Sequence, residues 1–295
     1  MFALLVTCLA LAPEGAAQEL RPRFTTNQEF LLRVQSWATV EGNASGTLFE
    51  YKVRLDNVRK AKVLDVAADG TARLELEYLE YEMYINGPSG ETPAKGAFKH
   101  YLGTKVVIRV TPTGEVAEVE RLEEYLKTLR AKSSGLSALF GSFMRPENIK
   151  LELEQLFDFY PAKPVRAGDN WSKDSRIAAI DAGEWKVKNN YSYRGPSGVN
   201  GQKRDLIDLR VELKQEGTTP LKGIPHLSQS KSIAYDIESM TGVIWLDPTS
   251  SLPVVAELEG VIKQKHQGKQ AERAFDSLFR VKQRVTIEPA PTLKK

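Results

Sequence analysis

The chain is poor in cysteine and histidine, the side chains that most often hold transition metals in proteins. Its single cysteine, Cys8, lies in the first apolar stretch, so the chain beyond it can form neither a disulfide nor a thiolate metal site. The three histidines, His100, His226 and His266, are far apart in the sequence, whereas metal ligands usually recur at short spacing. We therefore predict no metal and no cofactor.

Compact enzyme motifs are also missing. No G-x-S-x-G motif occurs, and the glycine-rich stretches at 87–90 and 195–201 lack the Lys-Ser/Thr ending of a phosphate-binding loop. The acidic residues of 71–84 alternate along one predicted strand, which is typical of a solvated face. A hydrolase would need titratable side chains that converge from distant positions, for example His100 with Glu82. The sequence thus favours a protein without enzymatic activity.

Neither sign of charge is in large excess, since 41 Lys and Arg residues stand against 38 Asp and Glu, a net charge of +3. This balance argues against nucleic acid as a partner. The apolar run at 1–12 is shorter than the roughly 20 residues that span a bilayer, and the small residues Gly15, Ala16 and Ala17 follow it. This pattern is typical of a signal peptide at 1–17, cleaved near Ala17. We expect an exported, soluble protein, periplasmic or extracellular, with no transmembrane segment in the mature chain.

Alternation of apolar and polar residues dominates the rest of the chain and predicts β-strands. One face of each strand is apolar and the other polar, as in antiparallel sheets with one solvated face. The predicted strands are 29–40, 47–55, 71–84, 106–110, 184–193, 206–213, 233–237, 254–262 and 278–287.

Three glycine-containing pairs predict turns between strands: Asp69-Gly70, Thr113-Gly114 and Thr241-Gly242. The last two are embedded in similar segments, 106–119 and 233–246, each of which reads as a strand, a turn and a second strand. A duplicated meander would explain this likeness, although any two hairpins share the pattern.

The central segment has helical rather than strand periodicity. Apolar residues from Leu122 to Leu129 predict one helix, and Pro146 begins a second, which Pro161 and Pro164 end. The expected organisation is a linker at 18–28, a β-rich domain at 29–288 and a disordered tail at 289–295; possible lobes at 29–120 and 168–288 are joined by the helical segment 121–165.

Two local motifs are distinctive, and both are interpreted as structural. Residues 161–171 spell P-x-x-P-V-x-x-G-D-x-W, in which Gly168 permits a turn, Asp169 bonds the backbone and Trp171 begins a strand. Asp247-Pro248 is suited to a turn between two further strands.

At these residues the chain resembles a family of secreted bacterial β-rich domains of unknown function, in which a proline-bounded helix leads into a G-D-x-W strand. The turn at 247–254 is similar to one in periplasmic lipoprotein-sorting proteins, which fold as an incompletely closed antiparallel sheet that holds apolar chains under helices. These resemblances imply a concave sheet and no catalytic residue. We predict a mainly β (α+β) fold: a strongly curved antiparallel sheet, or two related meander sheets, with two or three central helices packed on the inner face.

Three functions remain open: a non-catalytic protein acting through contacts with an envelope protein, a carrier of lipid or other apolar ligands, and a hydrolase with an unrecognised site. A carrier requires an apolar cavity. The candidate cavity or lid residues are the apolar side chains between and beyond the two helices, namely Leu136, Leu139, Phe140, Phe143, Met144, Phe157 and Trp245.

Overall fold

The computed structural model describes residues 16–44, 47–87, 90–93, 98–132, 146–179, 183–199, 201–216, 230–268 and 275–289. Within these ranges the chain is mainly β. The helices are the single turn η1 (Lys99–Tyr101), α1 (Leu122–Lys132) and α3 (Pro146–Glu154). The strands are β1 (Glu29–Ala44), β2 (Thr47–Val66), β3 (Ala72–Gly87), β4 (Gly90–Pro93), β5 (Lys105–Val110), β6 (Val116–Glu120), β7 (Asn170–Ala179), β8 (Gly183–Val199), β9 (Gln202–Glu216), β10 (Ser230–Leu246), β11 (Pro253–Gly268) and β12 (Phe275–Pro289).

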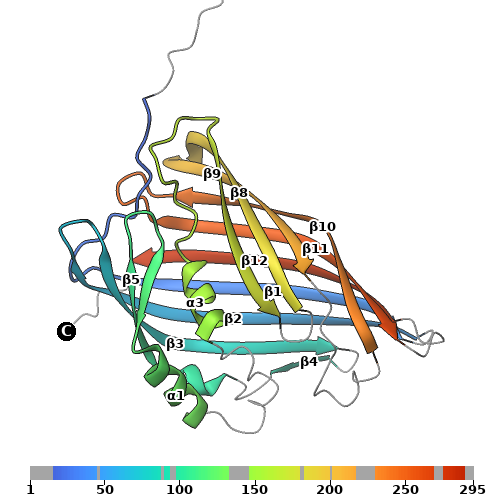
Figure 1. Ribbon diagram of the computed structural model, residues 1–295. Helices are drawn as coiled ribbons and strands as arrows, with labels where there is room; N and C mark the ends of the chain where they lie inside the picture. Colours follow the sequence, from blue (N-terminus) through green and yellow to red (C-terminus); the bar gives the residue numbers. More distant parts are fainter. Residues whose placement is uncertain are drawn as a thin grey trace, which may run out of the picture.

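The twelve strands of these ranges form one antiparallel sheet (Figure 1). Their order is β6-β5-β3-β2-β1-β12-β11-β10-β9-β8-β7, and β4 pairs with β3 beside this path. β1 and β12 pair along almost their whole length, from Phe30 opposite Pro289 to Ala44 opposite Phe275. The predicted mainly β fold is confirmed, and the two expected lobes contribute strands to a single sheet, so the alternative of two sheets is wrong. Among the described strands the sheet does not close, because β6 and β7 are its edges.

Several strands extend beyond their predicted limits. β2 was expected to end at residue 55 but continues to Val66. The pattern failed there because Asn57 and Arg59 lie at positions where alternation calls for apolar side chains, yet both are buried, with exposed fractions of 3% and 2%. Sequence reasoning reads such residues as the end of a strand.

The predicted turns at residues 69–70 and 113–114 are present. Gly70 has φ +85° and donates its N–H to Ala67 O, while Thr71 N donates to the Asp69 carboxylate. Gly114 has φ +77° and closes the turn between β5 and β6. A positive φ is the conformation that glycine adopts at least cost, which explains both residues.

The turn predicted at Thr241-Gly242 is wrong, because both residues lie inside the continuous strand β10. Gly242 is small for another reason: a Cβ there would lie 2.2 Å from the Glu257 carbonyl oxygen of β11. Glycine inside a strand pattern often marks such a close backbone approach rather than a turn. The proposed duplication of a strand–turn–strand unit at 233–246 therefore has no structural basis.

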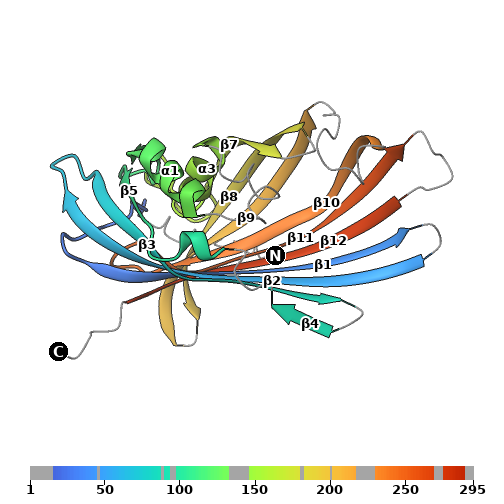
Figure 2. The same cartoon turned by 90° about the horizontal axis from the view of Figure 1, so that it is seen from below.

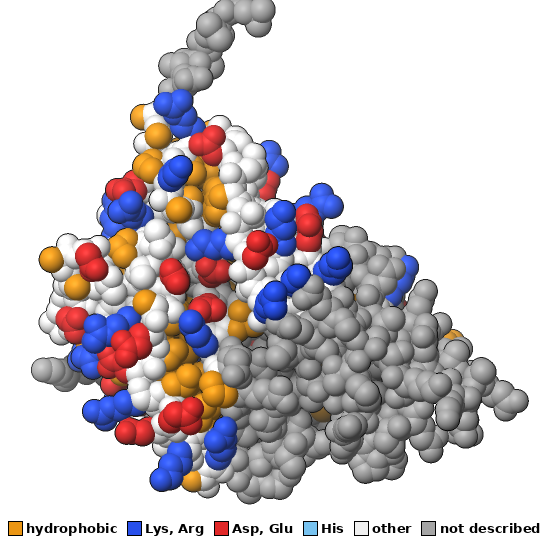
Figure 3. All heavy atoms as spheres, in the orientation of Figure 1, with side chains coloured by type: hydrophobic (Ala, Val, Ile, Leu, Met, Phe, Trp, Pro, Cys, Tyr) orange, Lys and Arg blue, Asp and Glu red, His pale blue; other side chains and the backbone are white. Residues whose placement is uncertain are grey.

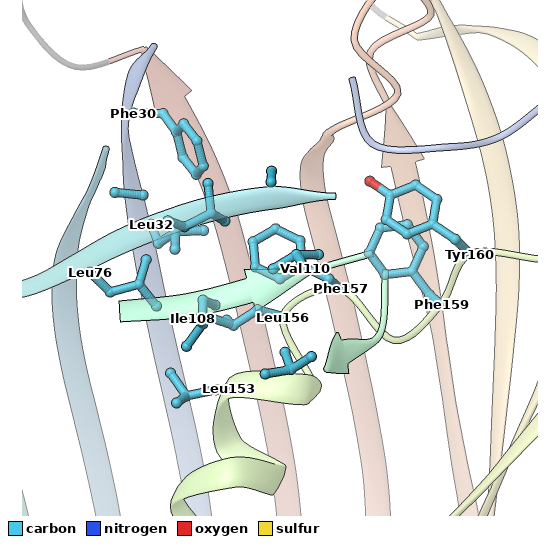
Figure 4. Close-up of a cluster of buried hydrophobic side chains, with 14 of the residues drawn as sticks. Phe30, Leu32, Leu76, Ile108, Val110, Leu153, Leu156, Phe157, Phe159 and Tyr160 are labelled. Carbon is cyan, nitrogen blue, oxygen red and sulfur yellow. The ribbon is translucent and has the colours of Figure 1, made fainter. Parts of the chain in front are cut away.

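The core lies at one end of the sheet, where helices and strands share one cluster of buried side chains (Figure 4). Leu32, Leu76 and Ile108 from the strands pack with Leu153 and Phe157 from α3 and the turn after it. The predicted helices are confirmed, and Pro146 is the first residue of α3. Figure 2 shows α1 and α3 near one end of the sheet, while β1, β2, β11 and β12 run on beyond them.

Residues 155–160, directly after α3, connect the two edges of the sheet. The Trp171 indole of β7 donates to Phe159 O at 3.0 Å, and Lys173 forms an ion pair with Asp158 at 2.8 Å and donates to Thr113 O at 3.3 Å. Because Thr113 belongs to the turn between β5 and β6, this segment fills the gap that strand pairing leaves open.

The segment expected to be a linker, 18–28, packs into the fold. Gln18 forms a β-bridge with Val165, and its side chain donates to Asp205 at 3.0 Å. Leu20 is 1% exposed, and the Phe24 ring packs edge-on against Phe157. The predicted signal peptide lies outside the described residues apart from Ala16 and Ala17, and the predicted tail lies outside them apart from Pro289.

Candidate functional site

The two faces of the sheet differ in chemistry. We call the inner face the one that carries the buried strand residues of the core, such as Leu32, Ala61 and Leu76, each 0% exposed. Since side chains alternate along a strand, every second residue from these lies on the same face. The register therefore traces the inner face along each strand, away from the core.

Beyond the core the inner face stays apolar but is only partly covered. We call this region the apolar trough; it comprises Met83 and Ile85 of β3, Phe49, Tyr51, Val53 and Leu55 of β2, Ser36, Ala38, Val40 and Gly42 of β1, Val281 and Gln283 of β12, and Leu258, Gly260 and Ile262 of β11. None of these described positions carries a charge. Tyr51 is 41% exposed, and the others are half-buried.

Small residues form the middle of the trough. One row of directly paired positions across five strands reads Ile85, Val53, Ala38, Val281 and Gly260. The neighbouring row has Ser36 on β1. Small side chains flanked by larger ones leave space along a surface, so these rows favour a hollow over a flat face.

The outer face of the same strands is charged. Ion pairs there include Arg280 with Glu41 and Arg284 with Glu257, both at 3.6 Å, and Arg54 with Asp56 at 3.1 Å. Figure 3 shows both signs of charge interspersed on the coloured part of the face seen in Figure 1. A face of this composition is solvated, whereas the uncharged inner face is suited to apolar contacts.

A polar cluster lies where the trough meets the packed core. The Arg59 guanidinium contacts the Glu152 carboxylate of α3 and lies over the Tyr78 ring, 4.5 Å from its centroid. The Tyr78 hydroxyl donates to the same Glu152 oxygen at 3.2 Å. Burial raises the pKa of Tyr78 well above its usual value and that of Tyr125 to about 12, so both hydroxyls remain protonated at neutral pH.

This cluster has buried polar atoms without hydrogen-bond partners among the described residues: Arg59 Nε, Arg59 Nη1 and Asn57 Oδ1. Sequence reasoning missed both residues because a polar pair within an apolar alternation reads as a loop. The signal that could have found them is the return of alternation afterwards, at Ala61 and Val63.

The structural motifs are placed as their chemistry predicts. Gly168 has φ +94°, Asp169 accepts a hydrogen bond from Arg166 N at 2.7 Å, and the Trp171 ring stacks on Tyr191. These contacts hold the entry to β7.

The second motif forms the turn between β10 and β11. Asp247 accepts hydrogen bonds from the backbone N–H of Thr249 at 3.0 Å and of Ser250 at 2.8 Å, and Pro248 occupies the turn. Arg204 of β9 pairs with the same carboxylate at 3.1 Å.

The structure does not bring the described candidate cavity residues together. Phe157 is 0% exposed in the core, and alternation places half-buried Trp245 on the opposite face from its neighbours Ile244 and Leu246. The other candidates, Leu136, Leu139, Phe140, Phe143 and Met144, lie outside the described residues.

A groove of about 960 Å³ lies across β7 to β12 and is lined partly by charged side chains, including Asp208, Arg210 and Glu259. Neither Phe157 nor Trp245 lines it.

Catalytic and metal chemistry have little support in the described ranges. His100 is 5% exposed among Phe98 and Tyr101, and burial lowers its pKa, while Glu82 is exposed and accepts a hydrogen bond from Tyr84. Within the same ranges, no three His, Cys, Asp or Glu side chains gather as metal ligands do. None of the helices found there has the length and apolar character needed to cross a bilayer.

Comparison with solved structures gives distant likenesses. Lipovitellin, in a structure described as showing lipid–protein interactions, is 11% identical, with a TM-score of 0.49 and 92% of this chain covered; this chain spans only 26% of that one. The hypothetical lipoprotein YmcC of Escherichia coli is 10% identical, with a TM-score of 0.23 and coverage of 86% of this chain and 88% of that one. A putative exported protein of Bacteroides fragilis with a YmcC-like fold is 9% identical, with a TM-score of 0.24 and coverage of 88% and 97%. Likenesses this weak carry no information on function.

Comparison by sequence is more specific in one region. No curated protein matches the chain. Residues 79–198, which include the P-x-x-P-V-x-x-G-D-x-W pattern, match a family of unknown function, DUF6263. The resemblance to a domain family of unknown function is therefore confirmed over this part of the chain.

Proposed function

We propose that this protein is a non-catalytic binding protein that holds apolar chains, such as the acyl chains of lipids, in the apolar trough. The observation that carries the proposal is the uncharged inner face, which continues beyond the core as half-buried side chains on five adjacent strands. Burial of apolar area stabilises a complex by roughly 25 cal/mol per Å², so an acyl chain gains affinity along such a surface.

The two central helices support the same proposal. Leu126 and Leu129 of α1 and Leu153 of α3 pack with strand residues of the inner face, so we infer that the helices cover this face at one end of the sheet. An apolar chain in the trough would then abut the covered end and lie along the strands. The predicted signal peptide at 1–17 is consistent with export, where acyl chains require a protein to shield them from water.

The first experiment is native mass spectrometry of residues 18–295 purified without detergent, followed by solvent extraction. A bound apolar mass supports the proposal. Binding is then measured by the fluorescence of an apolar dye, N-phenyl-1-naphthylamine, and its displacement by palmitate.

Adjacent residues on β1 offer matched variants, because Ala38 lies on the inner face and Thr39 on the outer face. Ala38→Asp places a carboxylate in the trough and is expected to weaken dye binding at least about tenfold, since an unpaired charge is costly in apolar surroundings. Ala38→Phe fills the same space without a charge and should also reduce binding. Thr39→Asp should change affinity less than about twofold. If all three variants bind like the unmodified protein, the trough is not the binding surface, and crosslinking for a protein partner becomes the next step.

A further inference from the structure

The inner face of β2 changes character at one point. From the open end it reads Phe49, Tyr51, Val53, Leu55, then Asn57 and Arg59, then Ala61 and Val63 of the packed core. From Phe49 to Asn57 the strand spans about 27 Å, at roughly 3.4 Å per residue. A polar pair thus lies at the inner end of the apolar trough, where one end of a chain bound along the strand would lie.

The hydrogen-bonding capacity of this pair is largely unused. Arg59 Nη2 contacts Glu152, but Arg59 Nε and Nη1 and Asn57 Oδ1 have no partner among the described residues, although all three atoms are buried. Buried polar groups are normally satisfied, and leaving them unpaired destabilises a fold. Unused donors on a buried guanidinium, adjoining an apolar surface, are typical of a site that receives an acceptor oxygen from a ligand.

The charge of the cluster restricts what that ligand is. Arg59 and Glu152 form an ion pair with no net charge, and Tyr78 adds a protonated hydroxyl to the same Glu152 oxygen. A carboxylate head would bring an uncompensated negative charge next to Glu152, whereas a neutral carbonyl oxygen accepts from Arg59 without this cost.

On this basis, and resting on the proposed function, we infer that Arg59 and Asn57 bind the polar head of the ligand and favour a neutral carbonyl, such as the ester of an esterified fatty acid. Arg59 donates to the carbonyl oxygen from Nε or Nη1. The Asn57 side-chain oxygen accepts from a hydroxyl of the head group where one is present, as in a monoacylglycerol.

The test compares ligands that share a chain and differ in the head: methyl palmitate, palmitate and hexadecane, each displacing the apolar dye from the full chain at a pH well above the carboxyl pKa. Methyl palmitate is expected to bind at least about tenfold more tightly than hexadecane, as a hydrogen bond to a charged donor provides. It should also bind more tightly than palmitate. Equal affinity for the ester and hexadecane overturns the head-group site while leaving apolar binding intact.

Variants assign the effect to Arg59. Arg59→Met keeps an unbranched side chain and should bring the ratio of ester to hexadecane affinity close to one. The control is Arg54→Met, on the same strand but facing outward over Tyr84, which should leave the ratio unchanged. An unchanged ratio in folded Arg59→Met contradicts the inference.

Glu152→Gln provides a second variant that keeps Arg59. It removes the compensating charge, so preference should shift from the ester towards palmitate by about tenfold or more. No shift overturns the charge argument. If the dye itself fails to bind the unmodified protein, both the inference and the proposed function are wrong, which separates that failure from a failure of the head-group site alone.

Discussion

Substitution of Gly114 tests how residues 155–160 join the two edges of the sheet. Gly114 has φ +77°, and a Cβ there would lie 2.0 Å from Phe157 O and 2.5 Å from Tyr160 Cδ2. The left-handed conformation costs a non-glycine residue about 1–2 kcal/mol. Displacing a packed backbone segment adds about 1–3 kcal/mol, so Gly114→Ala should lower the free energy of unfolding by about 2–5 kcal/mol.

Gly103 provides the matched control. It has a similar φ of +67°, but a Cβ there meets nothing within 4 Å. Gly103→Ala should therefore cost only the conformational part, about 1–2 kcal/mol. Urea unfolding followed by circular dichroism measures both values. If Gly114→Ala is no more destabilising than Gly103→Ala, the turn between β5 and β6 does not pack against residues 157–160 as described.

Three further outcomes are expected. Gly242→Ala should lower stability by about 1–3 kcal/mol, because the new Cβ meets Glu257 O at 2.2 Å, whereas Gly198→Ala, with open space around it, should not; thermal melts compare the two. Tyr160→Phe should cost about 1–3 kcal/mol in urea unfolding, because it leaves a buried main-chain carbonyl without the hydrogen bond at 2.7 Å; a smaller loss would mean that water replaces it. Burial lowers the pKa of His100 in the folded state below 6.5, so the unfolded chain binds more protons and stability should fall as pH drops from 6.5 towards the folded value; His100→Gln should flatten that part of the profile, and an unchanged slope would exclude His100 as its source.

Much of the fold could be predicted from local patterns. Alternation located most strands, and the turns at Gly70 and Gly114 followed from residues that tolerate a positive φ. The central helices followed from apolar spacing and from Pro146, which begins α3. The pairing of β1 with β12 could not be predicted in this way, because the register of strands so distant in sequence is set by packing across the whole sheet.

The two largest errors have one cause, since both assigned a local role to a residue whose role is long-range. Gly242 was interpreted as a turn residue, but it allows close approach of the Glu257 backbone on the neighbouring strand. Asn57 and Arg59 were interpreted as the end of a strand, but they lie buried within it, where Arg59 meets Glu152 of a helix.

Conflicts between local pattern and global fold are most often found at strained or functional positions. The Gly242 conflict is explained by packing, because the glycine relieves a contact that any Cβ would create. The Arg59 conflict is not, because the ion pair with Glu152 leaves two buried nitrogen atoms unsatisfied. An aliphatic side chain at position 59 would continue the core from Ala61 and avoid this cost. A buried arginine that weakens the fold at the inner end of an apolar surface is therefore better explained by a ligand than by stability.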